Sequence, residues 1–271
     1  MRIGNREFKL GEKVYVMGIL NITPDSFSDG GKFNDMEKAM QQVEKLIEDG
    51  ADIIDVGGES TRPGHEQITE AEEIQRVVPV IREIKKRYDI PVSIDTYKSK
   101  VAEAALEAGA DLLNDIWGFL YDENMAVLAA RYDVPVCLMH NRNNTDYNDF
   151  VNDVVKDLRK CLAVAEKHGV KKENIMLDPG VGFGKTYEQN LNIMNQLEKI
   201  CDMGYPVLLG TSRKSMIGLT LDLPVTEREE GTIATSVIGA IKGCDFVRVH
   251  DVKANIRALK MTGAILQSGS K

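Results

Sequence analysis

Long apolar runs, paired cysteines and an excess of basic residues are all missing from this sequence, and each absence excludes a class of protein. No segment approaches the roughly 20 apolar residues of a membrane span. The start, MRIGNREFKLGEK, has no apolar stretch behind its charges, so we expect no signal peptide. The cysteines, at positions 137, 161, 201 and 244, form no CxxC pair, which favours free thiols in a cytoplasmic protein over zinc ligands or disulfides. A net charge of -8 argues against binding to nucleic acid, although a few local cations can still bind a small anionic substrate.

Apolar, β-branched runs recur along the chain and predict strands. They lie at Val14–Leu20, Ile53–Val56, Val92–Ile94, Leu112–Leu113, Val134–Met139, Ile175–Leu177, Val207–Leu209 and Phe246–Val249. Helical periodicity fills the segments between them, as at residues 36–50, 70–88, 100–109, 151–169 and 228–243, and several of these segments close on glycine. Eight strands that alternate with helices indicate a parallel sheet with helical crossovers.

Eight is also the number of strands that closes a TIM (β/α)8 barrel of about 250 residues. The 271-residue chain shows no linker or composition shift. A doubly wound open sheet would need a glycine-rich turn after its first strand, but residues 21–24 read Asn-Ile-Thr-Pro. We therefore predict an α/β fold, a TIM (β/α)8 barrel, as a single domain over residues 14–271. Residues 1–13 are predicted to form a short N-terminal β-hairpin that turns at Gly4-Asn5.

Polar residues stand at the carboxyl end of each predicted strand. They are Asn21, Asp55, Asp95, Asn114 with Asp115, His140, Asp178, Thr211 with Lys214, and Arg248 with His250. In a barrel these ends meet at one mouth, where the active sites of this fold lie. Each residue by itself is more often a helix cap or a turn former than a ligand, but the recurrence on strand after strand favours a site.

The residue types at these ends narrow the chemistry of the predicted site. Two acids and an amide suit a heterocycle that presents several N–H donors; they are Asp95, Asp178 and Asn114. Cationic and imidazole groups suit an anion, and phosphate sites in barrels often use the loops after strands 7 and 8; these groups are Lys214, Arg248 and His250. Asn21 offers a hard oxygen to Mg²⁺, which binds through few protein ligands plus substrate phosphates. The pattern predicts a phosphorylated heterocycle with a magnesium-assisted leaving group.

The segment DPGVGFGK, residues 178–185, superficially looks like a phosphate-binding loop. It lacks the Walker spacing G-x-x-x-x-G-K-[ST], because only three residues separate Gly180 from Gly184. We predict instead that its glycines let the backbone pass close to a flat ligand beside Phe183.

Taken together, the motifs of this chain resemble those of the dihydropteroate synthases over essentially its full length. The matching segments are MGILNITPDSFSDGG (17–31), DIIDVGGESTRPG (52–64), SIDT (93–96), LLNDIWG (112–118), VCLMH (136–140), IMLDPGVGFGK (175–185), LLGTSRKSMIG (208–218) and RVHDV (248–252). The resemblance implies a TIM-barrel homodimer that acts in folate biosynthesis and is a sulfonamide target. The family's reaction joins 6-hydroxymethyl-7,8-dihydropterin diphosphate to p-aminobenzoate and gives 7,8-dihydropteroate and pyrophosphate.

The resemblance also assigns individual residues to each part of the two substrates. The pterin would be bound by Asp95, Asn114, Asp178 and Lys214, with Met139 against its ring. The diphosphate would be held by Asn21 (through Mg²⁺), Arg248 and His250. The p-aminobenzoate would lie under Phe27, Thr61, Arg62 and Pro63 from two loops, against a fixed wall of Phe183, Lys214 and Ser215. Residues 23–31 would act as a mobile lid that Asp25 orders around pyrophosphate.

For the mechanism we expect a dissociative displacement, in which pyrophosphate leaves before the aniline nitrogen attacks. The residues expected to act in catalysis are Asp25, Asp95, Lys214, Arg248 and His250. Two alternatives stay open at this point. A pterin-binding barrel of the folate-dependent methyltransferase type would share the pterin residues but would need neither loop. A non-catalytic pterin-binding barrel would carry a damaged site, whereas every matched position here is intact.

Overall fold

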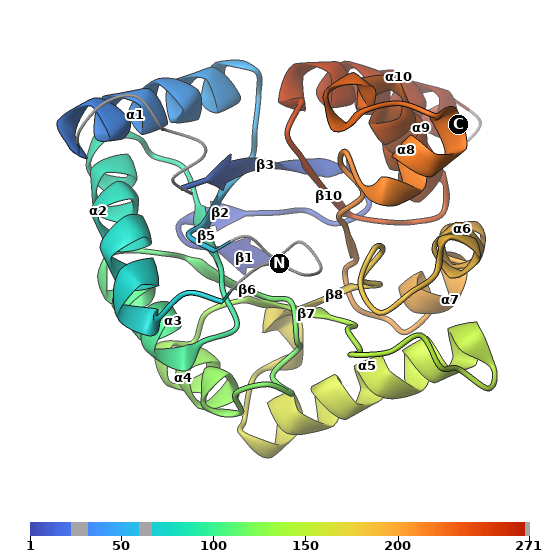
Figure 1. Ribbon diagram of the computed structural model, residues 1–271, viewed down its shortest axis with the longest axis horizontal. Coiled ribbons are helices and arrows are strands. Elements are labelled where there is room, and N and C mark those ends of the chain that lie inside the picture. Colours follow the sequence, from blue (N-terminus) through green and yellow to red (C-terminus); the bar gives the residue numbers. More distant parts are fainter. Residues whose placement is uncertain (23–31, 60–66, 269–271) are drawn as a thin grey trace.

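Eight parallel strands form the centre of the computed structural model, which describes residues 1–22, 32–59 and 67–268 (Figure 1). In chain order the strands are β3 (Tyr15–Asn21), β4 (Ile53–Gly57), β5 (Val92–Asp95), β6 (Leu112–Asp115), β7 (Val136–Met139), β8 (Ile175–Asp178), β9 (Leu208–Leu209) and β10 (Phe246–Val249). They are hydrogen-bonded in the order β8-β7-β6-β5-β4-β3-β10-β9. A parallel bridge between Leu177 and Val207 joins the two edges of this sheet. The predicted TIM barrel is confirmed.

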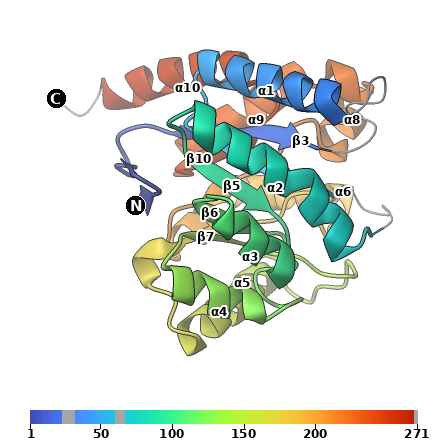
Figure 2. The ribbon, with the colours of Figure 1, turned by 90° about the vertical axis from the view of Figure 1, so that its left-hand side faces the viewer.

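Helices surround the strands on the outside of the ring (Figure 1). They are α1 (Lys32–Glu48), α2 (Glu70–Arg87), α3 (Ser99–Glu107), α4 (Asn124–Tyr132), α5 (Phe150–Lys167), α6 (Tyr187–Asn195), α7 (Glu198–Cys201), α8 (Ser215–Leu221), α9 (Glu229–Ile241) and α10 (Val252–Gln267). Figure 2 shows α1, α2, α3 and α4 following one another along one side of the barrel. Among the residues that the structure describes, no helix is long and apolar enough to cross a membrane.

The local sequence explains where these helices begin and end. At the start of α2 the Thr69 hydroxyl accepts a hydrogen bond from Glu72 N, which satisfies one of the free N–H groups of the first turn. Three acidic residues lie in that turn and three basic residues in the last turn, so both ends of the helix dipole are favourably charged. In α6, Thr186 and Gln189 form a capping box.

The strands separate two layers of apolar packing, because successive side chains on a strand point to opposite faces. Tyr15 and Met17 of β3 point into the barrel and join an interior cluster, while Val16 and Leu20 pack outward against the helices. The interior cluster consists of Ile3, Phe8, Tyr15, Met17, Ile53, Leu112, Cys137, Met176, Leu208 and Phe246. Its members are all buried, so the barrel is packed with side chains and is not a channel.

The amino-terminal hairpin covers the lower end of this interior. Strands β1 (Arg2–Ile3) and β2 (Arg6–Glu7) pair antiparallel around Gly4, whose φ of +58° favours glycine. The hairpin lies across the centre of the ring in Figure 1. Phe8 packs on Tyr15 with ring centroids 4.9 Å apart, so the amino ends of the strands are filled with apolar side chains. The predicted hairpin is confirmed, and a substrate site is left to the opposite end.

Candidate active site at the barrel mouth

An arginine and two carboxylates meet at the carboxyl ends of β4, β5 and β10. Arg248 Nε lies 2.6 Å from Asp55 Oδ2, and Arg248 Nη2 lies 2.7 Å from Asp95 Oδ2. Asp55 is fully buried and Asp95 is 5% exposed. One guanidinium therefore compensates two buried carboxylates, and we call these three residues the Arg248 cluster. The side chain of Asn114 in β6 donates to Asp55 at 3.3–3.4 Å and extends the cluster by one strand.

Asp95 carries an oxygen that the rest of the Arg248 cluster does not use. Its Oδ1 is buried and has no hydrogen-bond partner among the described residues. Burial raises the pKa of Asp95 to about 7, although the charge of Arg248 opposes that shift. A buried acceptor without a donor is costly. Such an atom at the mouth of a barrel fits a ligand that brings its own N–H group.

A second acid and a lysine lie at the ends of β8 and β9. Asp178 is buried, and its Oδ1 accepts a hydrogen bond of 2.7 Å from Gly180 N. Burial raises its pKa, while the charge of Lys214 acts to lower it. Lys214 donates to Val181 O and lies 4.6 Å from the centre of the Phe183 ring. Burial lowers the pKa of this lysine to about 8 against the opposing effect of Asp178.

The predicted anion residues lie on the neighbouring strand β10 and in the loop before α8. His250 N donates to Ser212 Oγ at 3.2 Å, and Ser212 Oγ lies 2.9 Å from His250 Nδ1. The Ser212 hydroxyl therefore contacts both the backbone and the ring of His250. Sequence reasoning did not find Ser212, whose signal was only its place in the Thr-Ser-Arg-Lys segment.

Apolar side chains form one wall of the mouth. Tyr97, Ile116 and Met139 are buried together, with Trp117 and Phe183 packed against them. Met139 is paired with Asp178 in the register of β7 and β8, so a thioether lies beside an acid that suits a heterocycle. Ser215, the first residue of α8, is exposed.

The strand ends do not all contribute to one cluster. His140 is buried, but its Nε2 lies 3.3 Å from Asp157 of α5, behind the sheet. Thr211 bonds to Thr235 of α9 at 2.8 Å. Asp115 accepts from the backbone N–H groups of Trp117 and Phe119 and so holds a turn. These three fit the ordinary role of a polar residue after a strand.

Five predicted site residues lie outside the described residues; they are Asp25, Phe27, Thr61, Arg62 and Pro63. The predicted lid, residues 23–31, lies outside them as well.

The glycines of the 178–185 segment have neighbours other than the ones we expected. A Cβ on Gly180 would overlap the carbonyl oxygen of His140, and one on Gly184 would lie 2.6 Å from Arg142 O. Both glycines have positive φ, +67° and +53°. A second loop, residues 140–148, therefore approaches this backbone closely enough to explain both glycines without a ligand.

A candidate metal ligand lies at the edge of the mouth. Asn21 is the last residue of β3 and is exposed. A Cβ at Gly57 would lie 3.7 Å from Asn21 Oδ1 and 3.6 Å from Asp95 Oδ2, so the two side chains flank the same point. Within the described ranges no three His, Cys, Asp or Glu residues form a metal-binding group. The donors described there fit a metal held by one protein oxygen and a substrate, as Mg²⁺ often is.

Comparisons with known proteins agree with this arrangement. The sequence matches the family described as pterin binding enzyme over residues 17–250. A dihydropteroate synthase of Clostridium beijerinckii is 65% identical over 268 residues, which are 98% of this chain and 100% of that protein. The crystal structure of a dihydropteroate synthase from Clostridium difficile, in the presence of pteroic acid, matches with a TM-score of 0.94 at 52% identity, covering 96% of this chain and 99% of that one. A dihydropteroate synthase from Xanthomonas albilineans with 4-aminobenzoic acid has a TM-score of 0.90 at 40% identity, with 94% and 93% covered.

Proposed function

Because this chain belongs to the dihydropteroate synthases, a branch of the pterin-binding enzymes, we propose that its barrel mouth joins 6-hydroxymethyl-7,8-dihydropterin diphosphate to p-aminobenzoate. The products are 7,8-dihydropteroate and pyrophosphate. The observation that carries the placement of the pterin is Asp95 Oδ1, a buried acceptor without a partner among the described residues. A pterin ring presents N–H donors in one plane and can supply that partner.

The pterin lies between the two acids of the mouth in this proposal. Asp95 accepts from one edge of the ring, Asp178 accepts from another, and Asn114 supplies a group that both donates and accepts. Asn114 is already oriented, since its amide donates to Asp55. Lys214 lies near Asp178 and can donate to a ring carbonyl. Met139 packs against the ring face from the apolar wall.

Charge at the mouth favours a cation on the bound pterin. When pyrophosphate leaves, positive charge develops at the methylene carbon and spreads into the ring. Asp95 and Asp178 are held in place before the reaction by Arg248 and by Gly180 N, so they stabilise that charge without reorganising. The aniline nitrogen is neutral at pH 7 and attacks without a general base.

The diphosphate points towards Asn21, Arg248 and His250. The two bonds of Arg248 to Asp55 and Asp95 account for two of its five N–H donors. His250 can donate a ring N–H to a phosphate oxygen. Asn21 would hold Mg²⁺ together with the diphosphate, and the bound ion supplies positive charge to the leaving group.

The p-aminobenzoate lies on the far side of the pterin methylene, against Phe183, Lys214 and Ser215. The cation of Lys214 lies over the Phe183 ring, and the two together offer an apolar face and a charge for a benzoate. The two loops that cover this substrate contain five residues that keep their predicted roles; they are Asp25, Phe27, Thr61, Arg62 and Pro63.

One assay tests the proposed function directly. Purified protein with Mg²⁺ and the pterin diphosphate is expected to release pyrophosphate only when p-aminobenzoate is present, with dihydropteroate formed in equal amount. Release that ignores p-aminobenzoate, or no product at all, would contradict the proposal. A chelator gives the second arm, since removal of Mg²⁺ should lower turnover with the diphosphate substrate.

We also propose that the protein is a cytoplasmic homodimer that pairs through its last three helices. Large apolar side chains are exposed there; they are Leu219, Leu221, Ile238, Ile241, Met261, Ile265 and Leu266. Ile238 and Ile241 of α9 lie three residues apart, and Met261 and Ile265 of α10 lie four apart, so each of these pairs forms a stripe on one helix face. Figure 1 shows α8, α9 and α10 gathered on one side of the barrel. Exposed apolar side chains gathered on neighbouring helices are typical of an interface between protein chains.

Light scattering tests the dimer. The wild-type chain should have twice the mass of one chain, and the double variant Ile241→Glu with Ile265→Glu should have the mass of one. A monomeric wild type would contradict the proposed interface, and so would a dimer that survives both charges.

A further inference from the structure

Two loops at the barrel mouth are joined to each other by a set of polar contacts that the proposed reaction does not use. They are residues 140–148 after β7 and residues 179–186 after β8. Tyr147 Oη donates to Gly184 O at 2.7 Å, and Gln189 Nε2 donates to Thr145 O at 3.1 Å. The glycines at 180 and 184 admit the close approach of the first loop. The loop of residues 179–186 is therefore held by contacts with the loop of residues 140–148 as well as by hydrogen bonds within its own turn.

Lys185 lies at the centre of this contact. Its Nζ is 2.8 Å from Gly180 O, 3.0 Å from Phe183 O and 2.8 Å from His140 Nδ1. As an ammonium Lys185 has three donors and no acceptor, so these three acceptors satisfy it completely and offset the burial that lowers its pKa to about 7. Two of the acceptors are carbonyl groups of its own turn, so the ammonium closes the turn over residues 180–185. The third fastens that turn to the end of β7.

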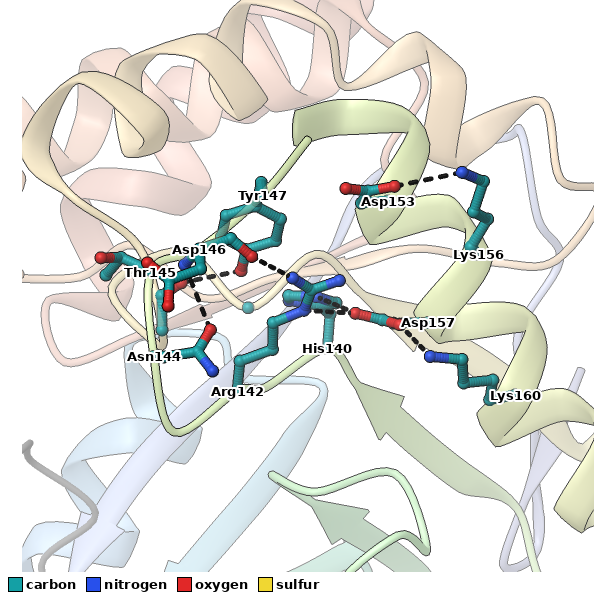
Figure 3. Close-up of polar contacts among 12 residues, drawn as sticks. His140, Arg142, Asn144, Thr145, Asp146, Tyr147, Asp153, Lys156, Asp157 and Lys160 are labelled. Atoms are coloured by element: carbon teal, nitrogen blue, oxygen red, sulfur yellow. Dashed lines mark hydrogen bonds and ion pairs between the residues drawn. The ribbon is translucent and has the colours of Figure 1, made fainter. Parts of the chain in front are cut away.

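The state of His140 follows from its neighbours. Because the Asp157 carboxylate accepts, the ring proton of His140 lies on Nε2, which faces Asp157 Oδ2 at 3.3 Å, and Nδ1 is left to accept from Lys185. Burial lowers the pKa of His140 to about 4, which keeps the ring neutral. Asp157 is fixed in turn by Arg142 at 2.6 Å and by Lys160 at 2.7 Å (Figure 3). A chain of three residues, Lys185–His140–Asp157, thus runs from the turn to helix α5.

The turn that Lys185 closes carries Phe183, whereas the backbone of the acid before it is held by the sheet. Asp178 belongs to β8, and its carbonyl accepts from His140 N at 3.0 Å within the sheet ladder, although its side chain also accepts from Gly180 N of the turn. Phe183 lies in the middle of the turn, where its N–H donates to Gly180 O at 3.1 Å and its ring packs on the apolar wall, so its position depends on the bonds that close the turn. Loss of Lys185 should therefore move the Phe183 ring and leave the Asp178 backbone in place.

We propose that Lys185 is a positioning residue for p-aminobenzoate, which acts through Phe183 and is itself aligned by His140 and Asp157. The proposal rests on the proposed function, in which Phe183 forms the fixed wall of the p-aminobenzoate pocket. Lys185 touches neither substrate in this account. It fixes the position of Phe183, against which p-aminobenzoate packs.

The test is a double-mutant cycle between Lys185 and Phe183. Lys185→Met is expected to raise KM for p-aminobenzoate by roughly tenfold to a hundredfold, because a small displacement of a positioning group is costly. Binding of the pterin diphosphate, measured by calorimetry, should weaken by a much smaller factor. In a Phe183→Ala background the same change should add little, because residues that act through one contact are not additive.

A matched control is Lys156→Met. This exposed lysine lies on the same helix as Asp157 but pairs with Asp153, outside the chain from Lys185 to Asp157, so its KM values should not change. Should Lys185→Met fold poorly, Tyr147→Phe removes one bond to the same turn and should raise KM for p-aminobenzoate by a smaller factor.

The outcomes separate the two proposals. If Phe183→Ala leaves KM for p-aminobenzoate unchanged, the wall assignment of the proposed function is wrong. If Phe183→Ala raises that KM while Lys185→Met and Tyr147→Phe do not, the positioning role is wrong. Additive effects of Lys185→Met and Phe183→Ala, or an equal loss of pterin binding, would also overturn it.

Discussion

Two clusters at the mouth end of the barrel contain the same charges and differ in whether their hydrogen bonds are complete. In the Arg248 cluster one arginine faces Asp55 and Asp95. In the second, which we call the Lys98 cluster, Lys98 faces Glu59 at 2.5 Å and Glu73 at 2.8 Å. Each therefore has one cation against two buried carboxylates. Charge count alone does not distinguish a binding site from a support.

The hydrogen bonds do distinguish them. Lys98 Nζ also donates to Ile68 O at 2.8 Å, so its three donors are used. Tyr97 Oη donates to Glu59 Oε1 at 2.6 Å, and Ile68 N donates to Glu59 Oε2 at 3.0 Å. Burial acts to lower the pKa of Lys98, but the bonds to both glutamates outweigh it and raise that pKa. The Arg248 cluster, by contrast, leaves Asp95 Oδ1 without a described partner. Completed bonds indicate a structural support, and an open acceptor indicates a ligand.

The largest effect that we expect comes from Asp95→Asn. Loss of one preorganised charge at the pterin should lower kcat by roughly a hundredfold to a thousandfold. Steady-state rates of pyrophosphate release measure it. Turnover close to wild type would show that Asp95 does not stabilise the developing cation. It would also contradict the interpretation of the Arg248 cluster as the binding site and of the Lys98 cluster as a support.

The same variant should not lose stability. Because burial raises the folded-state pKa of Asp95 to about 7, above its ordinary value of 3.8, its contribution to stability is full below pH 4 and is lost as pH rises to 7. Above pH 7 the ionised group is a net cost, so Asp95→Asn should be more stable at pH 8 by about 1 kcal/mol or more. Urea unfolding at pH 8 checks the sign.

Lys98→Met, unlike Asp95→Asn, should lose stability. Removing the cation that pairs with Glu59 and Glu73 leaves two buried carboxylates, which should lower the free energy of unfolding by about 3–5 kcal/mol. Unfolding in urea gives this value. A loss below 1 kcal/mol would mean that the cluster is not a support; Lys100→Met, which removes an exposed lysine paired with Glu70, is the matched control.

The pH dependence of catalysis should reflect the raised pKa of Asp95 in the Arg248 cluster. As pH falls below about 7, Asp95 takes up a proton, and kcat/KM for the pterin diphosphate should fall about tenfold per pH unit. Pyrophosphate release between pH 5.5 and 8.5 measures this. A profile that stays flat down to pH 6 would contradict a catalytic carboxylate with a raised pKa.

A smaller loss of stability than that of Lys98→Met is expected for Tyr97→Phe. It removes one donor from Glu59 Oε1 and leaves Lys98 in place, so the loss of stability should be about 1–3 kcal/mol. A double-mutant cycle with Lys98→Met should show coupling between the two residues, because they share Glu59. Independent effects would mean that the Lys98 cluster does not act as a unit.

The sequence by itself determined the barrel, because eight apolar runs alternate with amphipathic segments and that pattern has few packed solutions. It also determined which residues stand at the mouth, since a polar residue after a strand in a barrel lies at the carboxyl end. Asp95, Asn114, Asp178 and Arg248 were all found in this way, and the structure brings Asp95, Asn114 and Arg248 together around Asp55.

Only the tertiary structure decided how these residues are paired. Asp55 and Arg248 are 193 positions apart, and nothing local couples them. The inward direction of Asp95 and the outward direction of His140 also depend on how each strand end meets its helix. The same holds for Gly180 and Gly184, whose missing side chains are explained by the approach of the 140–148 loop. Such contacts form between distant segments, so periodicity and local preference cannot specify them.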